Sequence, residues 1–260
     1  MTQERVSSSS GATPWLRIRQ PNSNIRLRLF CFPYAGGAAS IYRTWHQHLP
    51  TYIQVCAVQL PGRENRIRER PFTKMGELVQ ALMPSLLPYL DKPFALFGHS
   101  MGSVIVYELA QQVRQQTGQT PTHLFVSARR APFLPNPEAP IHALPTDELF
   151  LAELQRRYNN VPAALFQDAE LRDLFVPLLR ADFKLVERYQ YKKTTPLSCP
   201  IVAFGGESDG YATRPELMAW QELTHDKYAL HLLPGGHFYL NAHTQALLTY
   251  ITEYLSITHT

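Results

Sequence analysis

The chain has 260 residues, 45% of them hydrophobic and 18% charged, which suits one sizeable folded domain and excludes a mainly disordered protein. The net charge of +4 lies entirely in residues 1–28, so the remaining body carries 20 basic and 20 acidic groups and is not expected to bind nucleic acid. No apolar run approaches the ~20 residues that span a bilayer and the first 15 residues are too polar for a secretory signal, so we expect a cytoplasmic protein with no membrane partner.

Residues 1–24 are rich in serine and arginine and contain glycine and proline, which predicts a flexible basic N-terminal tail. After this tail, short apolar stretches that suit buried strands alternate with segments of helical periodicity. The predicted strands, in chain order, are 25–32, 53–60, 93–99, 123–128, 200–206 and 228–236. The predicted helices are 41–49, 74–90, 104–114, 146–157, 168–179, 181–189 and 241–255, and a glycine-rich turn occupies 34–40.

Strands that alternate with helices predict an α/β fold, in which a mostly parallel central sheet is flanked by helices. Residues 25–130 and 196–257 are expected to form this core. Residues 131–195 interrupt the alternation, because they contain several helical pieces and no convincing strand. The simplest interpretation is a helical lid insertion over the ends of the strands, and a second structural subdomain is the alternative.

The strongest local motif is Gly98-His99-Ser100-Met101-Gly102, a G-x-S-x-G between a predicted strand and a predicted helix. Glycines two positions before and after the serine relieve the crowding of a tight strand-to-helix turn. The helix N-terminus behind Ser100 adds partial positive charge where an alkoxide would develop. The pattern predicts that Ser100 is the nucleophile of an alpha/beta hydrolase fold, and an ordinary serine in a tight turn is the alternative.

A serine nucleophile needs a histidine base and a carboxylate that orients it, in the chain order Ser, then Asp or Glu, then His. His237 is the candidate base, because it alone among ten histidines lies in a glycine-flanked loop directly after a predicted strand. Asp209 is the favoured acid over Glu207, since the loop must extend beyond the strand before its carboxylate can meet the base. Asp182, in the lid segment, is a weaker rival. His99 adjoins the nucleophile and is expected to support the turn.

The tetrahedral intermediate of acyl transfer needs two backbone N–H groups that form an oxyanion hole. One is expected from Met101, the residue after the nucleophile. The other is expected from the glycine-rich turn after the first predicted strand, where Ala35 is the favoured donor and Gly36 its rival. The three cysteines of the chain have no metal-ligand spacing and are expected to be reduced core residues. Hydrolysis by a serine triad requires no metal or cofactor, so none is expected.

With these motifs the chain resembles the type II thioesterases that accompany polyketide synthases and nonribosomal peptide synthetases. The resemblance lies in CFPYAGGAAS (31–40), AVQLPGRENR (57–66), PFALFGHSMG (93–102), HLFVSARRAP (123–132), LRADF (179–183), IVAFGGESD (201–209) and GGHFYL (235–240). It implies an alpha/beta hydrolase fold, a triad of Ser100, Asp209 and His237, and an oxyanion hole formed by Ala35 and Met101. One departure lies in the lid segment, where Asn159-Asn160 stands in place of an expected glycine pair.

The resemblance also implies a substrate class and a role. Such enzymes hydrolyse acyl or aminoacyl groups from the phosphopantetheine arm of acyl or peptidyl carrier proteins, which restores blocked synthases in antibiotic biosynthesis. The chain contains no carrier-like segment of its own, so we expect it to act on a carrier protein in trans and to be a monomer. The alternatives are a serine esterase of small free esters and a non-catalytic carrier-binding protein with a hydrolase fold.

Two further sets of side chains are candidates for contact with substrate or partner. Tyr34, Phe133 and Phe238 are candidates for an acyl channel, and each is also typical of plain core. Several arginines could steer an acidic carrier protein, although interleaved glutamates favour a solvated loop over a docking site. These arginines are Arg63, Arg66, Arg68, Arg70, Arg129 and Arg130.

Overall fold

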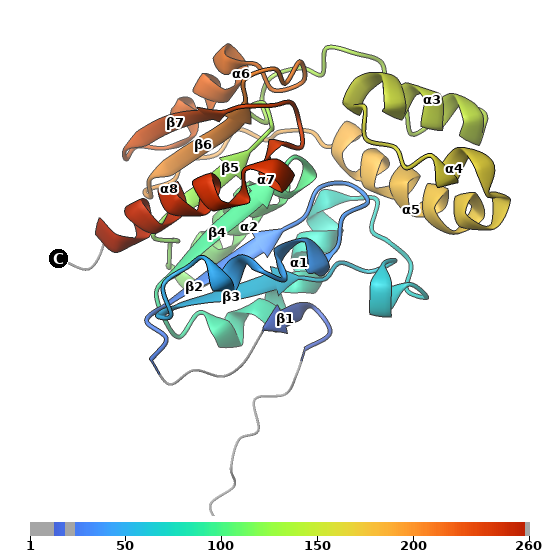
Figure 1. Cartoon of the computed structure of the whole chain (residues 1–260). Coiled ribbons are helices and arrows are strands. Elements are labelled where there is room, and N and C mark those ends of the chain that lie inside the picture. The colour runs from blue at the N-terminus through green and yellow to red at the C-terminus, as the bar shows by residue number, and fades with distance from the viewer. Residues whose placement is uncertain (1–12, 19–23, 258–260) are drawn as a thin grey trace, which may run out of the picture.

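A computed structural model describes residues 13–18 and 24–257, which form a seven-stranded sheet flanked by helices (Figure 1). The strand order is β1-β3-β2-β4-β5-β6-β7, and every neighbouring pair is parallel except β1 with β3. The strands are β1 (Leu16–Ile18), β2 (Leu27–Phe32), β3 (Ile53–Val58), β4 (Phe94–His99), β5 (Leu124–Ser127), β6 (Ile201–Gly206) and β7 (Tyr228–Leu233). The predicted α/β fold with a mostly parallel sheet is confirmed.

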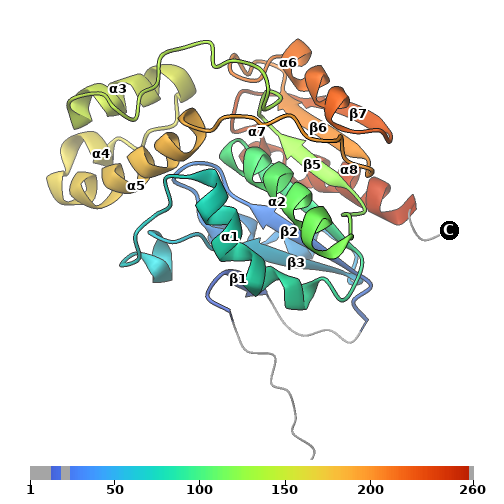
Figure 2. The ribbon, with the colours of Figure 1, turned by 180° about the vertical axis from the view of Figure 1, so that it is seen from behind.

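Helices cover both faces of the sheet, and a separate group lies beside it. The helices are α1 (Met75–Leu86), α2 (Met101–Thr117), α3 (Asp147–Tyr158), α4 (Ala164–Gln167), α5 (Ala169–Glu187), α6 (Arg214–Met218), α7 (Tyr239–Ala242) and α8 (Thr244–Ile257). α1 and α2 lie on the face seen in Figure 2, whereas α8 lies on the face seen in Figure 1 and α3–α5 gather beside the sheet. None of the helices in the described ranges is long and apolar enough to cross a membrane.

Alternate residues of β2 face the two apolar layers of the core. Phe30 and Phe32 pack in the cluster that includes α1 and α2, whereas Leu29 and Cys31 pack in the cluster that includes α8. All four side chains are fully buried. The almost continuous apolar sequence of this strand therefore follows from a sheet that is covered on both faces.

The prediction of a flexible tail over 1–24 is wrong for the part that reaches the sheet. Leu16–Ile18 forms β1, which pairs antiparallel with β3 at the sheet edge. Trp15 is buried, and the guanidinium of Arg66 lies over its ring, 4.2 Å from the centroid. Three residues are too few for a hydrophobic period to stand out in a polar sequence. Most of the predicted tail lies outside the described residues.

The other predicted strands are present in slightly shortened form, and the helix predictions for 41–49, 168–179 and 181–189 are wrong. Short 3₁₀ turns at Ala39–Tyr42 and Trp45–Gln47 replace the helix predicted over 41–49, because so short a run forms few of the hydrogen bonds that sustain an α-helix. The helices predicted over 168–179 and 181–189 are one helix, α5, whose buried face runs on without a break.

Within the described chain, residues 131–195 hold α3, α4 and α5 and no strand. These helices pack around an apolar cluster of their own that includes Phe150, Leu154 and Phe183. Asn159 follows the last residue of α3, and its φ of +47° is the left-handed conformation that glycine usually supplies after a helix. Asparagine tolerates this conformation better than most residues, so the departure from the expected glycine pair preserves the helix end.

Candidate active site

Ser100 occupies a strained turn between β4 and α2. Its φ of +53° and ψ of −110° lie outside the regions that residues with a side chain usually adopt. A Cβ on Gly98 would lie 2.2 Å from the backbone of Gly102, and a Cβ on Gly102 would lie 2.2 Å from the carbonyl oxygen of Phe32. The backbone N–H of Ser100 donates a 2.7 Å hydrogen bond to the carbonyl of Ser127 on β5. Only glycine at both flanking positions allows this turn.

Three side chains from three loops meet at the carboxyl edge of the sheet. His237, which follows β7, has its Nε2 2.9 Å from Ser100 Oγ and its Nδ1 2.8 Å from Asp209 Oδ2. Asp209 follows β6 and is buried, and its Oδ1 accepts a 2.9 Å hydrogen bond from the backbone N–H of Tyr211. Parallel strands bring their carboxyl ends to one edge, which explains how residues far apart in sequence come together. The arrangement can deprotonate a serine and stabilise the resulting imidazolium.

The loops that carry Asp209 and His237 approach each other closely at two glycines. A Cβ on Gly206 would lie 2.2 Å from the carbonyl oxygen of Gly236, so no larger residue fits there without a shift. Glu207, the rival acid, is exposed to solvent, whereas only 7% of Asp209 is exposed. The structure therefore brings Asp209 to the imidazole and leaves Glu207 outside.

The backbone N–H groups of Ala35 and Met101 donate no hydrogen bond within the described part of the chain. Ala35 belongs to the turn after β2 and lines the same cavity as Ser100. Met101 is the first residue of α2, so its N–H has no acceptor within the helix. Gly36, the rival donor, gives its N–H to Asp182 Oδ2 at 2.8 Å. Ala35 and Met101 thus remain available to an oxyanion, and Gly36 does not.

A buried ion pair holds the turn that contains Ala35. Asp182, on α5, accepts hydrogen bonds of 2.8 and 3.0 Å from Arg63 in addition to the one from Gly36. Arg63 also donates to the carbonyl of Gly37 at 2.9 Å. Only 4% of the Arg63 side chain and 2% of the Asp182 side chain are exposed. The interpretations of Asp182 as a rival catalytic acid and of Arg63 as a solvated arginine are therefore wrong.

The other arginines of this loop differ in burial. Arg66 is buried, forms an ion pair with Glu69 at 2.5 Å and donates to the carbonyl of Gln59 at 2.8 Å. Arg68 and Arg70 are exposed. The interpretation as a solvated loop holds for Arg68 and Arg70 but is wrong for Arg66. A buried guanidinium needs hydrogen-bond or ion-pair partners, and Arg66 has them in Glu69 and Gln59.

Replacing Asp182 by asparagine should weaken both the fold and the turn that contains Ala35. The Arg63 guanidinium would stay buried without a counter-charge, which costs on the order of 3 kcal/mol in the free energy of unfolding. The turn would lose its anchor at Gly36, and loss of one oxyanion donor lowers kcat by about 100-fold. Urea unfolding and steady-state thioester hydrolysis measure the two effects separately.

Asp147→Asn is the matched control for this experiment. Asp147 also pairs with an arginine, Arg180, in the same group of helices, but 40% of its side chain is exposed. An exposed pair contributes at most about 1 kcal/mol. If the Asp182→Asn protein kept the urea midpoint and the kcat of the Asp147→Asn protein, the anchoring role of Asp182 would be disproved.

His99 supports the nucleophile turn from within the core. It is fully buried, its Nδ1 lies 2.8 Å from Ser127 Oγ, and that hydroxyl lies 2.5 Å from Tyr239 OH. Burial lowers the pKa of His99 well below its usual value, so the ring stays neutral at physiological pH. Its ring centroid is 5.5 Å from that of His237, and a neutral neighbour of this kind does not compete for the serine proton.

An apolar cavity of about 920 Å³, its open mouth included, begins at Ser100. Tyr34 and Phe238 line it, with their ring centroids 4.9 Å apart. Phe133 does not line it and instead packs against Tyr191, 5.9 Å between centroids. The structure corrects the prediction of Phe133 as a channel residue, because the loop after β5 places it against the segment that follows α5.

Two features of the site have no counterpart in the sequence prediction. Tyr158, the last residue of α3, has its ring centroid 4.9 Å from that of His237 and 5.1 Å from that of Tyr211. Burial raises the pKa of Tyr158 to about 12, which keeps its hydroxyl protonated. The second is the role of Asp182 as the anchor of Gly36 and Arg63, since the sequence suggests this residue only as a rival acid. In residues 13–18 and 24–257, no cluster of three metal-ligating side chains occurs.

Comparison with known proteins adds a family to this geometry. A family model described as a thioesterase domain matches residues 27–255 of the chain. Gramicidin S biosynthesis protein GrsT of Aneurinibacillus migulanus is 42% identical over 248 residues, which cover 95% of this chain and 96% of that protein. Thioesterase PikA5 of Streptomyces venezuelae is 35% identical over 259 residues, which cover 99% and 90%. The solved type II thioesterase BorB from the borrelidin biosynthetic cluster has a TM-score of 0.83 at 35% identity, covering 95% of this chain and 98% of that one.

Proposed function

The chain belongs to the thioesterase family, and from this we propose that it removes acyl or aminoacyl groups in trans from the phosphopantetheine arm of acyl and peptidyl carrier proteins. It is a thioester hydrolase with an alpha/beta hydrolase fold, similar to type II thioesterases of polyketide and nonribosomal peptide pathways. The observation that carries the proposal is the hydrogen-bonded series Ser100, His237 and Asp209 at the mouth of an apolar cavity.

The first half of the reaction forms an acyl-enzyme. His237 Nε2 takes the proton of Ser100 as Oγ attacks the thioester carbonyl, and Asp209 holds the imidazolium through Nδ1. The carbonyl oxygen becomes an oxyanion, which the N–H groups of Ala35 and Met101 stabilise. The C–S bond then breaks, and the sulfur departs with the proton from His237 as a thiol. Ser100 is left esterified to the acyl group.

The second half of the reaction hydrolyses this ester. His237 takes a proton from water, which attacks the acyl carbon, and the oxyanion forms again at the same two N–H groups. The C–O bond to Ser100 breaks, and His237 returns the proton to Oγ. The free acid leaves and the triad regains its starting state. No step needs a metal or a cofactor.

Residues 131–195 act as a lid over the apolar cavity in this proposal. Leu154 of α3, Leu165 of α4 and Leu179 of α5 all line the cavity, so every helix of the segment contributes a wall. An acyl chain that enters from Ser100 would lie among these apolar side chains. The separate apolar cluster of α3–α5 supports a segment that moves as one compact unit.

Two exposed arginines remain candidates for contact with an acidic carrier protein. Arg63 and Arg66 are buried and paired, which leaves Arg68 and Arg70 of that loop for a partner. We further propose that the enzyme acts as a monomer in the cytoplasm. Three free and buried cysteines support a reducing compartment.

A comparison of three substrates with one acyl group tests the proposed function. The substrates are an acyl-loaded carrier protein, the matching acyl-pantetheine and a p-nitrophenyl ester of the same acid. We expect kcat/KM for the carrier protein to exceed that for acyl-pantetheine by about 10-fold or more, which corresponds to 1.4 kcal/mol of additional contact. Equal kcat/KM values for the carrier protein and acyl-pantetheine would refute the assignment, and a preference for the p-nitrophenyl ester would favour an esterase.

A further inference from the structure

A second cavity, of about 530 Å³ with its open mouth included, adjoins the apolar cavity. Tyr158, Phe183 and His237 line both cavities, so they separate the two spaces. Ser100 lines only the apolar cavity. Arg129 and two carboxylates, those of Glu138 and Glu187, line only the second cavity, which we call the polar cavity. In the proposed reaction the acyl group occupies the apolar cavity. Of the residues that line the polar cavity, His237 alone takes part in the reaction.

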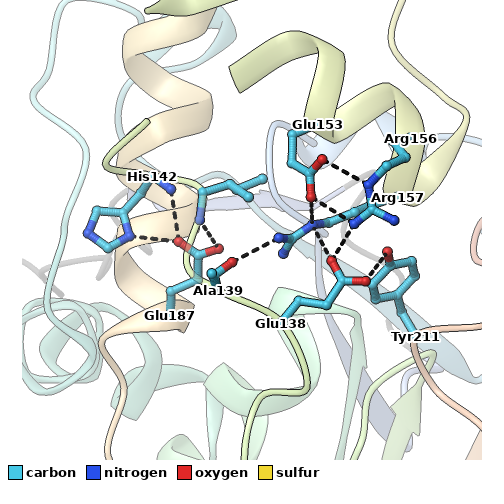
Figure 3. Close-up of polar contacts among 9 residues, drawn as sticks. Glu138, Ala139, His142, Glu153, Arg156, Arg157, Glu187 and Tyr211 are labelled. Atoms are coloured by element: carbon cyan, nitrogen blue, oxygen red, sulfur yellow. Dashed lines mark hydrogen bonds and ion pairs between the residues drawn. The ribbon is translucent and has the colours of Figure 1, made fainter. Parts of the chain in front are cut away.

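The carboxylates of the polar cavity already have partners, as Figure 3 shows. Glu187 accepts hydrogen bonds from the backbone N–H groups of Ile141 and His142, at 2.9 and 3.0 Å, and contacts His142 Nδ1 at 2.6 Å. Glu138 pairs with Arg157 at 2.9 Å and accepts from Tyr211 OH at 3.0 Å. These groups form the wall of the cavity and are not free to bind a ligand.

Arg129 is the exception among these charged residues. Its Nε is buried and has no hydrogen-bond partner, and within the described chain its guanidinium forms no ion pair. Arg130, its neighbour, pairs with Glu216 at 2.7 Å. Burial lowers the pKa of Arg129, because the surroundings solvate its charge poorly. A partly buried guanidinium without a partner is unfavourable unless a ligand supplies the missing acceptor.

The backbone around Arg129 is held in an unusual conformation. Ala128 has a φ of +51°, which residues with a side chain rarely adopt. Trp220 Nε1 donates a 2.7 Å hydrogen bond to the carbonyl of Arg129, and the N–H of Ala128 donates to the carbonyl of Phe204 at 2.8 Å. Strained backbone that surrounding contacts hold in place is common at ligand-binding sites. Here it carries Arg129 into the wall of the polar cavity.

We propose that Arg129 binds an amide carbonyl of the arm that leaves in the reaction, and that the polar cavity is the subsite of this arm. The inference rests on the proposed function. A thioester extends in two directions from its carbonyl, and the acyl side takes the apolar cavity. His237 protonates the departing sulfur, so the arm must leave past this histidine, which is where the polar cavity begins.

The dimensions of the arm select its amides as the ligands. With about 1.3 Å of advance per bond, the two amide carbonyl carbons of phosphopantetheine lie about 5 and about 10 Å from the sulfur, and the phosphorus lies about 17 Å away. The polar cavity begins at His237, which protonates this sulfur, and Arg129 lines the same cavity. The amides are therefore the polar groups of the arm that lie nearest to Arg129, and the phosphate lies farther away. A guanidinium is a strong donor to carbonyl oxygens at such a site.

Substrates with and without these amides test the inference. Hexanoyl-pantetheine carries both amides, whereas S-ethyl hexanethioate has the same acyl group and no amide. In Arg129→Met, we expect the ratio of kcat/KM for hexanoyl-pantetheine to kcat/KM for the ethyl thioester to fall about 10- to 100-fold, mainly through a higher KM for the pantetheine substrate. Arg43→Met, which removes an exposed arginine, should keep the wild-type ratio.

A structural defect would lower kcat/KM on both thioesters together and leave their ratio unchanged. An unchanged ratio in Arg129→Met, with or without a lower thermal midpoint, therefore overturns the inference. The proposed function fails in a different way, through a wild-type enzyme that prefers neither the carrier protein nor hexanoyl-pantetheine over the ethyl thioester. The two failures are distinguishable because one concerns the variant and the other the wild type.

Discussion

Ser100→Ala should lower kcat for thioester hydrolysis by about a millionfold, or about 8 kcal/mol of transition-state free energy. The substitution removes only Oγ, the atom that would form the acyl-enzyme. The Ser100 N–H still donates to Ser127, and the two flanking glycines are untouched, so the turn should keep its shape. Residual hydrolysis by the oxyanion hole and binding alone would remain far below the wild-type rate. Steady-state assays with an acyl-loaded carrier protein measure the loss.

Ser40→Ala is the matched control, because Ser40 is an exposed serine outside the cavity. It should keep the wild-type kcat, and the urea midpoints of both variants should stay close to that of the wild type. A Ser100→Ala protein that is folded and clears the acyl-carrier protein at the wild-type rate would rule out Ser100 as the nucleophile.

Asp209→Asn should lower kcat by about 10⁴-fold with little change in KM. The carboxylate accepts from His237 Nδ1 and so selects the tautomer whose Nε2 can take the serine proton. An amide at this position can donate to Nδ1, which would place the ring proton on the nitrogen that must act as base. The loss should fall on kcat, because the carboxylate stabilises the imidazolium of the transition state.

Glu207→Gln is the control for this variant, since Glu207 lies two residues away on the same loop and is exposed. It should keep the wild-type kcat within about twofold. The assignment of the acid would be reversed if Glu207→Gln were the inactive variant and Asp209→Asn the active one. Because Asp209 is buried beside His237 and Glu207 is exposed, we expect the opposite: an active Glu207→Gln and an impaired Asp209→Asn.

The catalytic candidates could be predicted from sequence because each lies in a short local pattern. Gly98 and Gly102 frame Ser100, and the crowding that requires them acts over a few residues. Asp209 and His237 each follow an apolar strand, and parallel strands end at one edge of the sheet. Local sequence therefore indicated both the residue types and the edge at which they meet.

The features that could not be predicted are set by contacts between distant parts of the chain. The ion pair of Arg63 with Asp182 joins residues 119 positions apart, and nothing near either residue signals the partner. The same holds for Arg129, whose lack of a partner is visible only once the surrounding side chains are placed. Phe133 has the composition of a channel residue, but the path of the loop after β5 decides its position.

Covalent labelling of the wild-type enzyme tests whether Ser100 is the nucleophile of the reaction. A fluorophosphonate reacts covalently with an activated serine. The enzyme is titrated with this reagent, and the rate of acyl-carrier hydrolysis is compared with the fraction of enzyme labelled. Peptide mass spectrometry then locates the labelled residue. We expect one phosphonyl group, attached to Ser100, and a loss of hydrolysis in proportion to labelling. Hydrolysis that persists when Ser100 is fully labelled, or that disappears with the label on another residue, would contradict it.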